Sequence, residues 1–231
     1  MAKLRVKITK GEEVRYISHL DYAGAIERAI RRANLPAAYS AGFNPHMKLS
    51  FASALGLGVT SEGEYMDVEF TAAVDPVMAR NKLNDSLPPG IFVKQSGYVD
   101  DRSPALMAVV NLAEYRILAP LAAGTEFCDV QASLRRFHSA DEVNYIRESP
   151  KKKREIDLKQ FLVQDIAAAA AGEAVRLSMA IKITPTGSVK AGEVLAALVA
   201  QFDLPVVQDS ALIHRVGLYI ANETVRSLPL P

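Results

Sequence analysis

Alternation of apolar and polar residues along the first hundred positions constrains the fold most strongly. The segment KLRVKITK at residues 3–10 puts apolar side chains on one face and basic ones on the other, as in a half-buried β-strand. Residues 18–36 then carry apolar side chains at helical spacing, and Pro36 opposes continuation of that helix. We expect the later elements to be strands at 46–52 and 64–70, a helix at 75–88 and a strand at 91–99.

The order β-α-β-β-α-β is that of a ferredoxin-like unit, and the second half of the chain repeats it loosely. There we expect strands at 113–121, 174–183 and 213–221, helices at 125–140 and 190–202, and a hairpin around PKKK at 150–153. The alanine-rich segment 165–174 reads as a short helix or loop. The sequence thus predicts an α+β protein with two tandem ferredoxin-like domains and antiparallel sheets, at residues 1–99 and 109–225.

Charge is spread unevenly along the chain, although the net charge is only +1. Residues 1–60 hold nine Lys or Arg against four Asp or Glu, residues 61–145 hold seven against thirteen, and residues 146–159 hold six against three. Because local charge attracts phosphate, the two basic zones favour a nucleic-acid partner.

Several classes of site are excluded by the residues themselves. Cys128 is the only cysteine, so the chain can form neither an internal disulfide nor a three-cysteine cluster. No HExxH, GxSxG, GxGxxG, Walker or Cys/His metal spacing occurs, and we expect no cofactor and no metal. No run approaches membrane-spanning length and the start lacks a signal-peptide core, so we expect a cytoplasmic protein without membrane contact.

The motif SHLD opens the first expected helix. Ser18 and Asp21 have the spacing of a capping box, which explains both residues structurally. His19 is not explained by capping. At the positive end of a helix its neutral form is favoured, so it is either a structural histidine or a proton acceptor or donor.

Three arginines lie on the polar face of that helix. Arg28, Arg31 and Arg32 are spaced i, i+3 and i+4, so they form one cluster. The cluster is either a solvated face or a phosphate-binding surface, since arginine suits phosphate well.

The stretch YSAGFNPHMKLSF at residues 39–51 is the most distinctive loop. Turn chemistry accounts for Gly42 and Pro45, but it does not account for the polar and aromatic residues around them. In the following strand Met47, Leu49 and Phe51 should point inward and leave the intervening polar residues outward. We therefore expect a ligand-holding loop that offers Tyr39, Phe43, Asn44, His46 and Lys48 to a phosphate chain with stackable bases.

The sheet face opposite the helices should be open and basic. It would carry Lys3, Arg5 and Lys7, with Tyr65 near its rim, and cross-strand ion pairs are the alternative reading. In the second half, the tip of the expected hairpin and the loop before the last helix add cations that can grip a phosphate backbone: Lys151, Lys152, Lys153, Arg154 and Lys190.

From Arg15 to Phe70 the chain resembles a bacterial family known as radical-SAM-linked proteins. The matching pieces are SHLD, RAIRRANLP, YSAGFNPHMKLSFA, LGLGVTSEGEYMDVE and, more weakly, IHRVGLYI. Members are fused to, or encoded beside, radical SAM enzymes. The resemblance supplies a context but no activity, and together with the basic zones it favours a non-catalytic accessory protein that binds tRNA or rRNA and presents it to a radical SAM modification enzyme.

A second likeness is architectural. Paired ferredoxin-like units with a histidine early in the first helix are similar to CRISPR repeat-processing endoribonucleases of the RAMP superfamily, which need no metal. This implies an alternative, a metal-independent endoribonuclease in which His19 or His46 acts as acid or base. A protein–protein adaptor that binds no RNA is the third reading.

Overall fold

The computed structural model describes residues 2–149, 152–222 and 225–230. The chain divides into two compact units, one formed by Met1–Asn111 with Arg215–Pro231 and the other by Leu112–His214. The last seventeen residues thus belong to the first unit, whereas the sequence assigned residues up to 225 to the second domain. The predicted α+β class with antiparallel strand pairing is confirmed. No helix in the described ranges is both long and apolar enough to cross a membrane.

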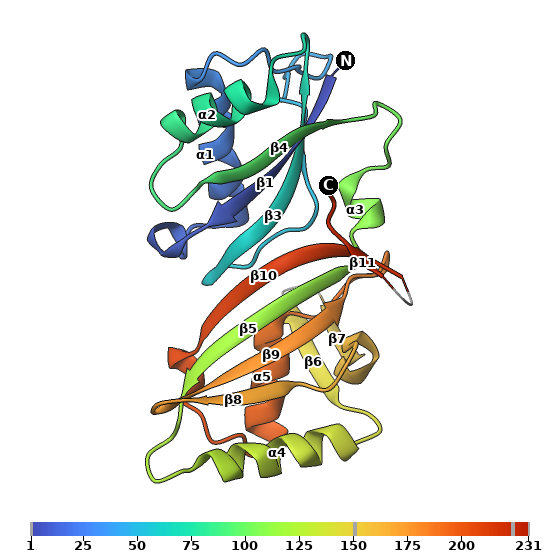
Figure 1. Ribbon diagram of the computed structural model, residues 1–231. Coiled ribbons are helices and arrows are strands. Elements are labelled where there is room, and N and C mark those ends of the chain that lie inside the picture. Colours follow the sequence, from blue (N-terminus) through green and yellow to red (C-terminus); the bar gives the residue numbers. More distant parts are fainter. Residues whose placement is uncertain (1, 150–151, 223–224, 231) are drawn as a thin grey trace. The chain divides into compact units, whose positions relative to one another are not determined.

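The first unit is an antiparallel sheet with two main helices on one side (Figure 1). Its elements, in chain order, are β1 (Ala2–Lys10), η1 (Glu12–Val14), α1 (His19–Arg32), β2 (Leu49–Phe51), β3 (Val59–Phe70), α2 (Pro76–Ser86), β4 (Val93–Val99), α3 (Leu106–Val109), β10 (Leu212–Ala221, from Arg215 onward) and β11 (Arg226–Ser227). The strand order is β4-β1-β3-β10, and β2 also pairs with β3. The helices α1 and α2 pack on the same sheet face, where the core lies.

Alternation sets which side chains of the first sheet enter that core. Leu4, Val6 and Ile8 of β1 are fully buried against the helices, as the sequence predicted. The opposite face is not the open basic surface that was expected. Arg5 is 5% exposed, and its guanidinium donates to both oxygens of Asp67 (2.7 and 2.9 Å) and to the carbonyl of Pro229 (3.0 Å).

That face is covered rather than free for a ligand. Leu230, close to the C-terminus, is 4% exposed and lies 3.2 Å from the position a Cβ on Gly97 would take. Tyr65, which the sequence placed at an exposed rim, is 1% exposed. The amino group of Lys3 is bound to the carbonyls of Asp101 and Ser103. The expectation of an open basic sheet is therefore wrong, because cross-strand pairing and the C-terminal segment use that face.

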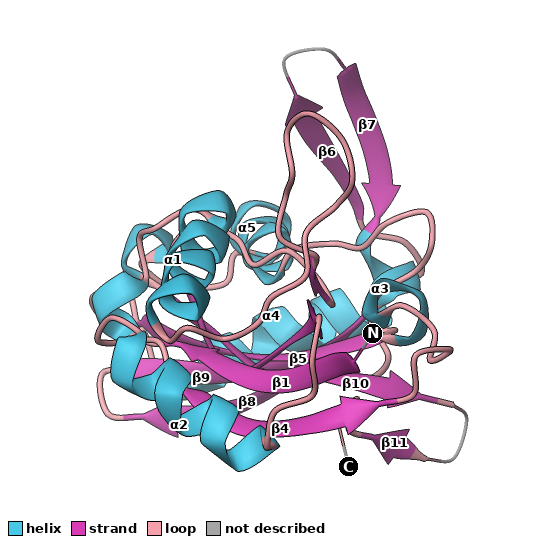
Figure 2. Cartoon of the chain, turned by 90° about the horizontal axis from the view of Figure 1, so that it is seen from above, coloured by secondary structure: helices cyan, strands magenta, loops and turns pink. Residues whose placement is uncertain are grey.

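The second unit contains a three-stranded antiparallel arrangement, β5-β9-β8, with α4 and α5. Its elements are β5 (Leu112–Pro120), α4 (Phe127–Ser139), β6 (Asn144–Ser149), β7 (Lys152–Asp157), η2 (Leu158–Phe161), β8 (Ala167–Ala171), β9 (Ala174–Lys182), α5 (Ala191–Phe202) and η3 (Gln208–Ser210). The strands β6 and β7 form the expected hairpin, a separate two-stranded ribbon (Figure 2).

One element of the second unit differs in type from its prediction. The alanine run at 167–171, expected as a helix or loop, is the strand β8. Alanine favours helices locally, but here each residue pairs with β9 in register from Ala167–Ser178 to Ala171–Ala174. Gly172, at φ +64°, forms the tight turn that makes this pairing possible. Tertiary pairing outweighs local propensity in this segment.

Candidate nucleic-acid interface

The helix α1 presents its arginines to solvent because its other side is buried. Tyr22, Ile26, Ala29 and Ile30 face the sheet. At the start, the hydroxyl of Ser18 accepts the amide of Asp21 (3.1 Å) and donates to its carboxylate (2.6 Å). The amide bond is the predicted cap, whereas the carboxylate binds the hydroxyl instead of returning to the backbone.

The helix ends before the predicted stop at Pro36. Asn34 adopts φ +51°, the left-handed conformation that commonly terminates helices, and Ala33 closes the last turn. The final turn therefore carries Arg31 and Arg32 directly ahead of the chain reversal that leads to the loop at 39–48.

The three arginines diverge in direction. Nε of Arg31 donates to the hydroxyl of Tyr39 (3.3 Å), while its terminal nitrogen approaches Glu27 (3.3 Å). Arg32 donates to the carbonyl of Ser86 at the end of α2 (2.6 Å). Arg28 lies back along the helix, 3.3 Å from the position a Cβ on Gly24 would take. All three remain exposed, but only Arg31 meets the distinctive loop.

The loop at 40–46 is closed by hydrogen bonds at its base. The amide of Ser40 donates to the carbonyl of His46 (2.8 Å), and the amide of His46 donates to the hydroxyl of Ser40 (3.0 Å). Gly42 takes φ +116°, a backbone conformation that favours glycine, which agrees with its expected place in a turn. Phe43, at the tip, is fully exposed, with a relative accessibility of 106%. The fold thus holds an aromatic ring in water, where it contributes nothing to the core.

The strand after the loop alternates as predicted. Met47 is 6% exposed, and Leu49 and Phe51 pack against the core, whereas His46 is exposed. Lys48 is half-buried and pairs with Glu69 on β3 (3.0 Å), so part of its charge is already matched. The structure brings Arg31 and Tyr39 together beside this loop, and Phe43, Asn44 and His46 lie exposed on it.

The basic positions of the second unit are arranged differently. On β7, Arg154 lies opposite Arg147 of β6, and Lys153 pairs with Glu148. Both Lys153 and Arg154 are exposed. Lys152 begins β7, and Lys151 lies outside the described residues.

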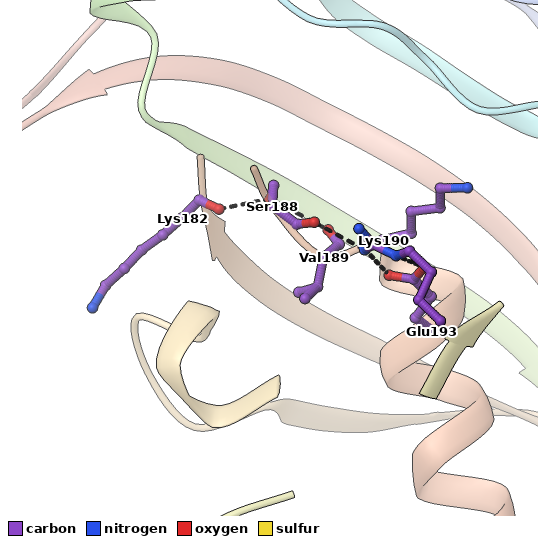
Figure 3. A network of polar contacts seen from close by, with 6 residues as sticks. Lys182, Ser188, Val189, Lys190 and Glu193 are labelled. Carbon is purple, nitrogen blue, oxygen red and sulfur yellow. Dashed lines mark hydrogen bonds and ion pairs between the residues drawn. The ribbon is translucent and has the colours of Figure 1, made fainter. Parts of the chain in front are cut away.

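The start of α5 already holds a carboxylate. Glu193 accepts the amide of Lys190 (2.8 Å; Figure 3). It also accepts a bidentate contact from Arg147 (2.7 and 2.6 Å), and Arg147 donates in addition to the carbonyl of Ser188. Because Glu193 occupies the N-terminal amide end, the loop at 184–190 does not offer the free anion site that its sequence suggested. Lys190 itself is exposed.

Sequence reasoning missed a buried polar cluster at the other end of α1. Arg215 is 4% exposed and Glu64 1%, and the guanidinium binds both carboxylate oxygens (3.1 and 2.9 Å). Lys10, 1% exposed, donates to the carbonyls of Arg15 and Ile17 (3.0 Å each). A signal was present in the sequence, because Lys10 follows Leu4, Val6 and Ile8 on the inward face of its strand.

His19 lies next to this cluster. Its ring meets Phe51 edge-on, with centroids 4.9 Å apart, and its Nδ1 is buried with no hydrogen-bond partner among the described residues. Burial lowers the pKa of His19 below 6.5, and Arg215 and Lys10 act in the same direction, whereas Glu64 opposes them. The imidazole is therefore neutral at physiological pH. In the described part of the chain no group of three or more His, Cys, Asp or Glu could hold a metal ion.

Comparison with known proteins adds a family but no activity. A family model described as "Uncharacterized protein conserved in bacteria (DUF2344)" matches residues 3–191. Among solved structures, the chain is similar to one from the "Crystal Structure of a Cbf5-Nop10-Gar1 Complex", with 11% sequence identity and a TM-score of 0.48. That match covers 94% of this chain but only 47% of the other, so this chain spans about half the length of the chain it matches. No curated protein matches the sequence.

Proposed function

Because the chain belongs to a bacterial family described only as uncharacterised conserved proteins (DUF2344), we propose from its own geometry that it binds RNA and presents it to a partner enzyme. The observation that carries the proposal is the surface formed by Arg31, Tyr39 and Phe43. A guanidinium in contact with a phenol lies beside a closed loop whose tip is a fully exposed aromatic ring.

This combination suits single-stranded RNA. Unpaired bases stack on exposed aromatic rings, and arginine pairs with phosphate or stacks on a base. Exposure of Phe43 is unfavourable in water unless a ligand covers the ring, because its burial would be worth about 2 kcal/mol. Arg28, Arg32, Asn44 and His46 extend the surface, and Lys48 joins it if phosphate competes with Glu69.

The partner in this proposal is a radical SAM enzyme that modifies tRNA or rRNA. The support is the resemblance of residues 15–70 to radical-SAM-linked proteins. Cys128 is the only cysteine, so the chain cannot itself hold a three-cysteine cluster and the partner must supply the radical chemistry. The chain would bind and position the RNA.

Each unit is proposed to be ferredoxin-like. In the first unit, β1, α1, β2, β3, α2 and β4 follow one another in the expected order, with β1 between β4 and β3, and β2 on the far side of β3. The second unit supports the same proposal through β5, α4, β8, β9 and α5, with the β6–β7 hairpin inserted after α4. Lys151, Lys152, Lys153, Arg154 and Lys190 would provide a second, non-specific contact to the RNA backbone.

Binding of a fluorescein-labelled single-stranded RNA of mixed sequence, followed by anisotropy, tests the proposal. We expect Phe43→Ser to weaken binding about tenfold, since stacking on one base is worth about 1–3 kcal/mol. Arg31→Ala should weaken it and flatten the salt dependence by about 0.7 in slope, the value for one phosphate contact on a single strand. Phe92→Ser and Lys82→Ala, at exposed positions elsewhere on the same unit, are the matched controls.

Two experimental outcomes would favour a different function over the presentation of RNA. Absence of RNA binding, or binding that salt does not affect, supports the protein–protein adaptor instead. The second is RNA cleavage in the presence of a chelator. The neutral imidazole of His19 and its unpartnered Nδ1 favour that alternative, in which cleavage is lost in His19→Ala while binding persists.

A further inference from the structure

The surface around the N-terminal end of α1 has a different chemistry from the RNA-binding surface proposed above. Three large apolar side chains are exposed there: Tyr16 (75%), Leu20 (81%) and Leu57 (66%). The residues belong to two segments, 12–21 and 54–58. Isolated exposed apolar residues are common on proteins, but a local group with this much exposure indicates an interaction site.

Hydrogen bonds hold the two segments together. The amide of Gly58 donates to the carbonyl of Arg15 (3.1 Å), and Arg15 donates to the carbonyl of Gly58 (2.7 Å). The ring of Tyr16 lies 4.0 Å from the position a Cβ on Gly58 would take, so it rests against the backbone next to Leu57. Leu20 lies in the first turn of α1, next to His19. The ring of His19 contacts Phe51, which precedes the second segment in the sequence. The backbone that carries Tyr16 and Leu57 is thus fixed by hydrogen bonds, and Leu20 lies four residues after Tyr16.

Within the two segments themselves, residues 12–21 and 54–58, every exposed charge is negative. Glu13 and Asp21 are exposed, and the side chain of Glu12 is 70% exposed although it pairs with Arg15. Two nearby cations do not offset these negative charges at the surface. Lys10 is 1% exposed and Arg15 is 4% exposed, and both are hydrogen-bonded. Residues 52–58 carry no charge. Burial lowers the pKa of His19, so its imidazole adds no positive charge at neutral pH.

We infer that residues 12–21 and 54–58 form a docking surface for a partner protein, and that its occupant is a segment with apolar side chains flanked by Lys or Arg. The apolar residues would cover Tyr16, Leu20 and Leu57, and the flanking cations would face Glu12, Glu13 and Asp21. An anionic surface of this kind attracts basic segments and repels RNA, so one molecule can hold RNA and a protein at separate places. The inference does not depend on RNA binding.

A phage-displayed library of random peptides, about 12 residues long, selected against the full chain tests the inference. We expect enrichment of peptides with two or more large apolar residues next to Lys or Arg. One such peptide, made synthetically, should bind at least about tenfold more weakly to the triple variant Tyr16→Ser, Leu20→Ser, Leu57→Ser. Met107→Ser with Val77→Ser, at exposed apolar positions of α3 and α2, should leave its Kd unchanged.

The charge requirement has its own variant. Glu13→Gln with Asp21→Asn keeps side-chain shape and the acceptor for Ser18, and should weaken the same peptide about threefold, with a smaller salt dependence. Enrichment of acidic peptides, failure to enrich apolar-basic ones, or unchanged binding by the triple variant would overturn the inference. Concentration-dependent dimerisation that the triple variant abolishes would also overturn it, because the occupant would then be a second copy of this chain. Loss of RNA binding alone leaves it standing.

Discussion

At the C-terminal end of α1 the cations Arg28, Arg31 and Arg32 are exposed, whereas at the N-terminal end Lys10 and Arg15 are buried beneath the surface. Both regions contain basic residues in similar number, so sequence composition does not distinguish them. The difference arises from the hydrogen-bond partners of each cation and from how exposed the cation remains. Lys10 and Arg15 are buried and donate to backbone carbonyls, so they contribute to the fold, whereas the three arginines remain exposed to a ligand although Arg32 also donates to the carbonyl of Ser86.

The exposed carboxylates also differ between the two ends. Near the N-terminal end, Glu12, Glu13 and Asp21 remain at the surface, although Glu12 pairs with Arg15 and Glu64 is buried, while at the C-terminal end Glu27 and Glu69 pair with Arg31 and Lys48. One amphipathic helix therefore separates an acidic, apolar surface from a basic, aromatic one. The helix has 14 residues and so spans about 21 Å, which is enough to keep two partners apart.

The largest expected effect is on stability, and it distinguishes the buried Glu64–Arg215 pair from the half-exposed Glu69–Lys48 pair. Glu64→Ala leaves Arg215 buried without its carboxylate, so we expect a loss of about 3–5 kcal/mol in the free energy of unfolding, measured by urea denaturation. Glu69→Ala, on the same strand, removes a half-exposed pair with Lys48 and should change stability by less than about 1 kcal/mol. Equal losses in the two variants would contradict the contrast between buried and exposed charge.

A double substitution separates an unpaired charge from lost packing. Glu64→Leu with Arg215→Met removes both charges and keeps apolar volume, so we expect it to recover most of the stability lost in Glu64→Ala. If the double variant is as unstable as Glu64→Ala, the geometry of the pair itself, rather than the desolvated charge, holds this part of the unit together.

A smaller effect concerns the ends of α1 as helix termini. Ser18→Ala removes the oxygen that accepts the amide of Asp21, and we expect a loss of about 1 kcal/mol in urea denaturation. Arg32→Ala removes an exposed contact to the carbonyl of Ser86 and should stay within about 0.5 kcal/mol of the unaltered protein. Ser18→Thr, which keeps a hydroxyl cap, should recover most of the loss. A neutral Ser18→Ala would show that packing of α1 makes its cap dispensable.

The features that were predictable from sequence are the local ones. Period-two alternation places Leu4, Val6 and Ile8 inward, and helical spacing buries Ile26 and Ile30. The same alternation extended by one step puts Lys10 inward. Charged residues at inward positions of a strand are therefore a readable signal of a buried polar cluster, and following that pattern would have found this one.

The features that were not predictable depend on long-range pairing. Glu64 meets Arg215 across 151 positions, and Arg147 meets Glu193 across 46, so no periodicity within one element could match them. The strand β8 was missed because the alanine run acquires its conformation from β9 and not from its own propensity. The candidate loop was found because turn chemistry explains Gly42 and Pro45 but leaves the polar and aromatic residues around them unexplained, whereas the contacts of Arg28 and Arg32 required the structure.

The smallest expected effect is the pH dependence at the N-terminal end of α1. Burial lowers the pKa of His19 below its ordinary value of 6.5, so the unfolded chain binds a proton at a higher pH than the folded one. Its contribution to stability is therefore complete above about pH 6.5 and is lost as the pH falls through the folded-state pKa. Titration of the His19 ring by NMR should show a midpoint below 6.5.

Substitution isolates this contribution from that of His138, which is also half-buried. The pKa of His138 is also lowered by burial, and its Nε2 accepts the amide of Ile166 (3.0 Å), so both residues should destabilise the fold in acid. His19→Gln should make the fall in unfolding free energy between pH 7 and 5 shallower, with the His138 part remaining. If His19 titrates above 6.5, its imidazolium is stabilised in the folded protein. The N-terminal surface would then carry a positive charge near neutral pH, and the contrast between the two ends of α1 would be weaker than its buried cations indicate.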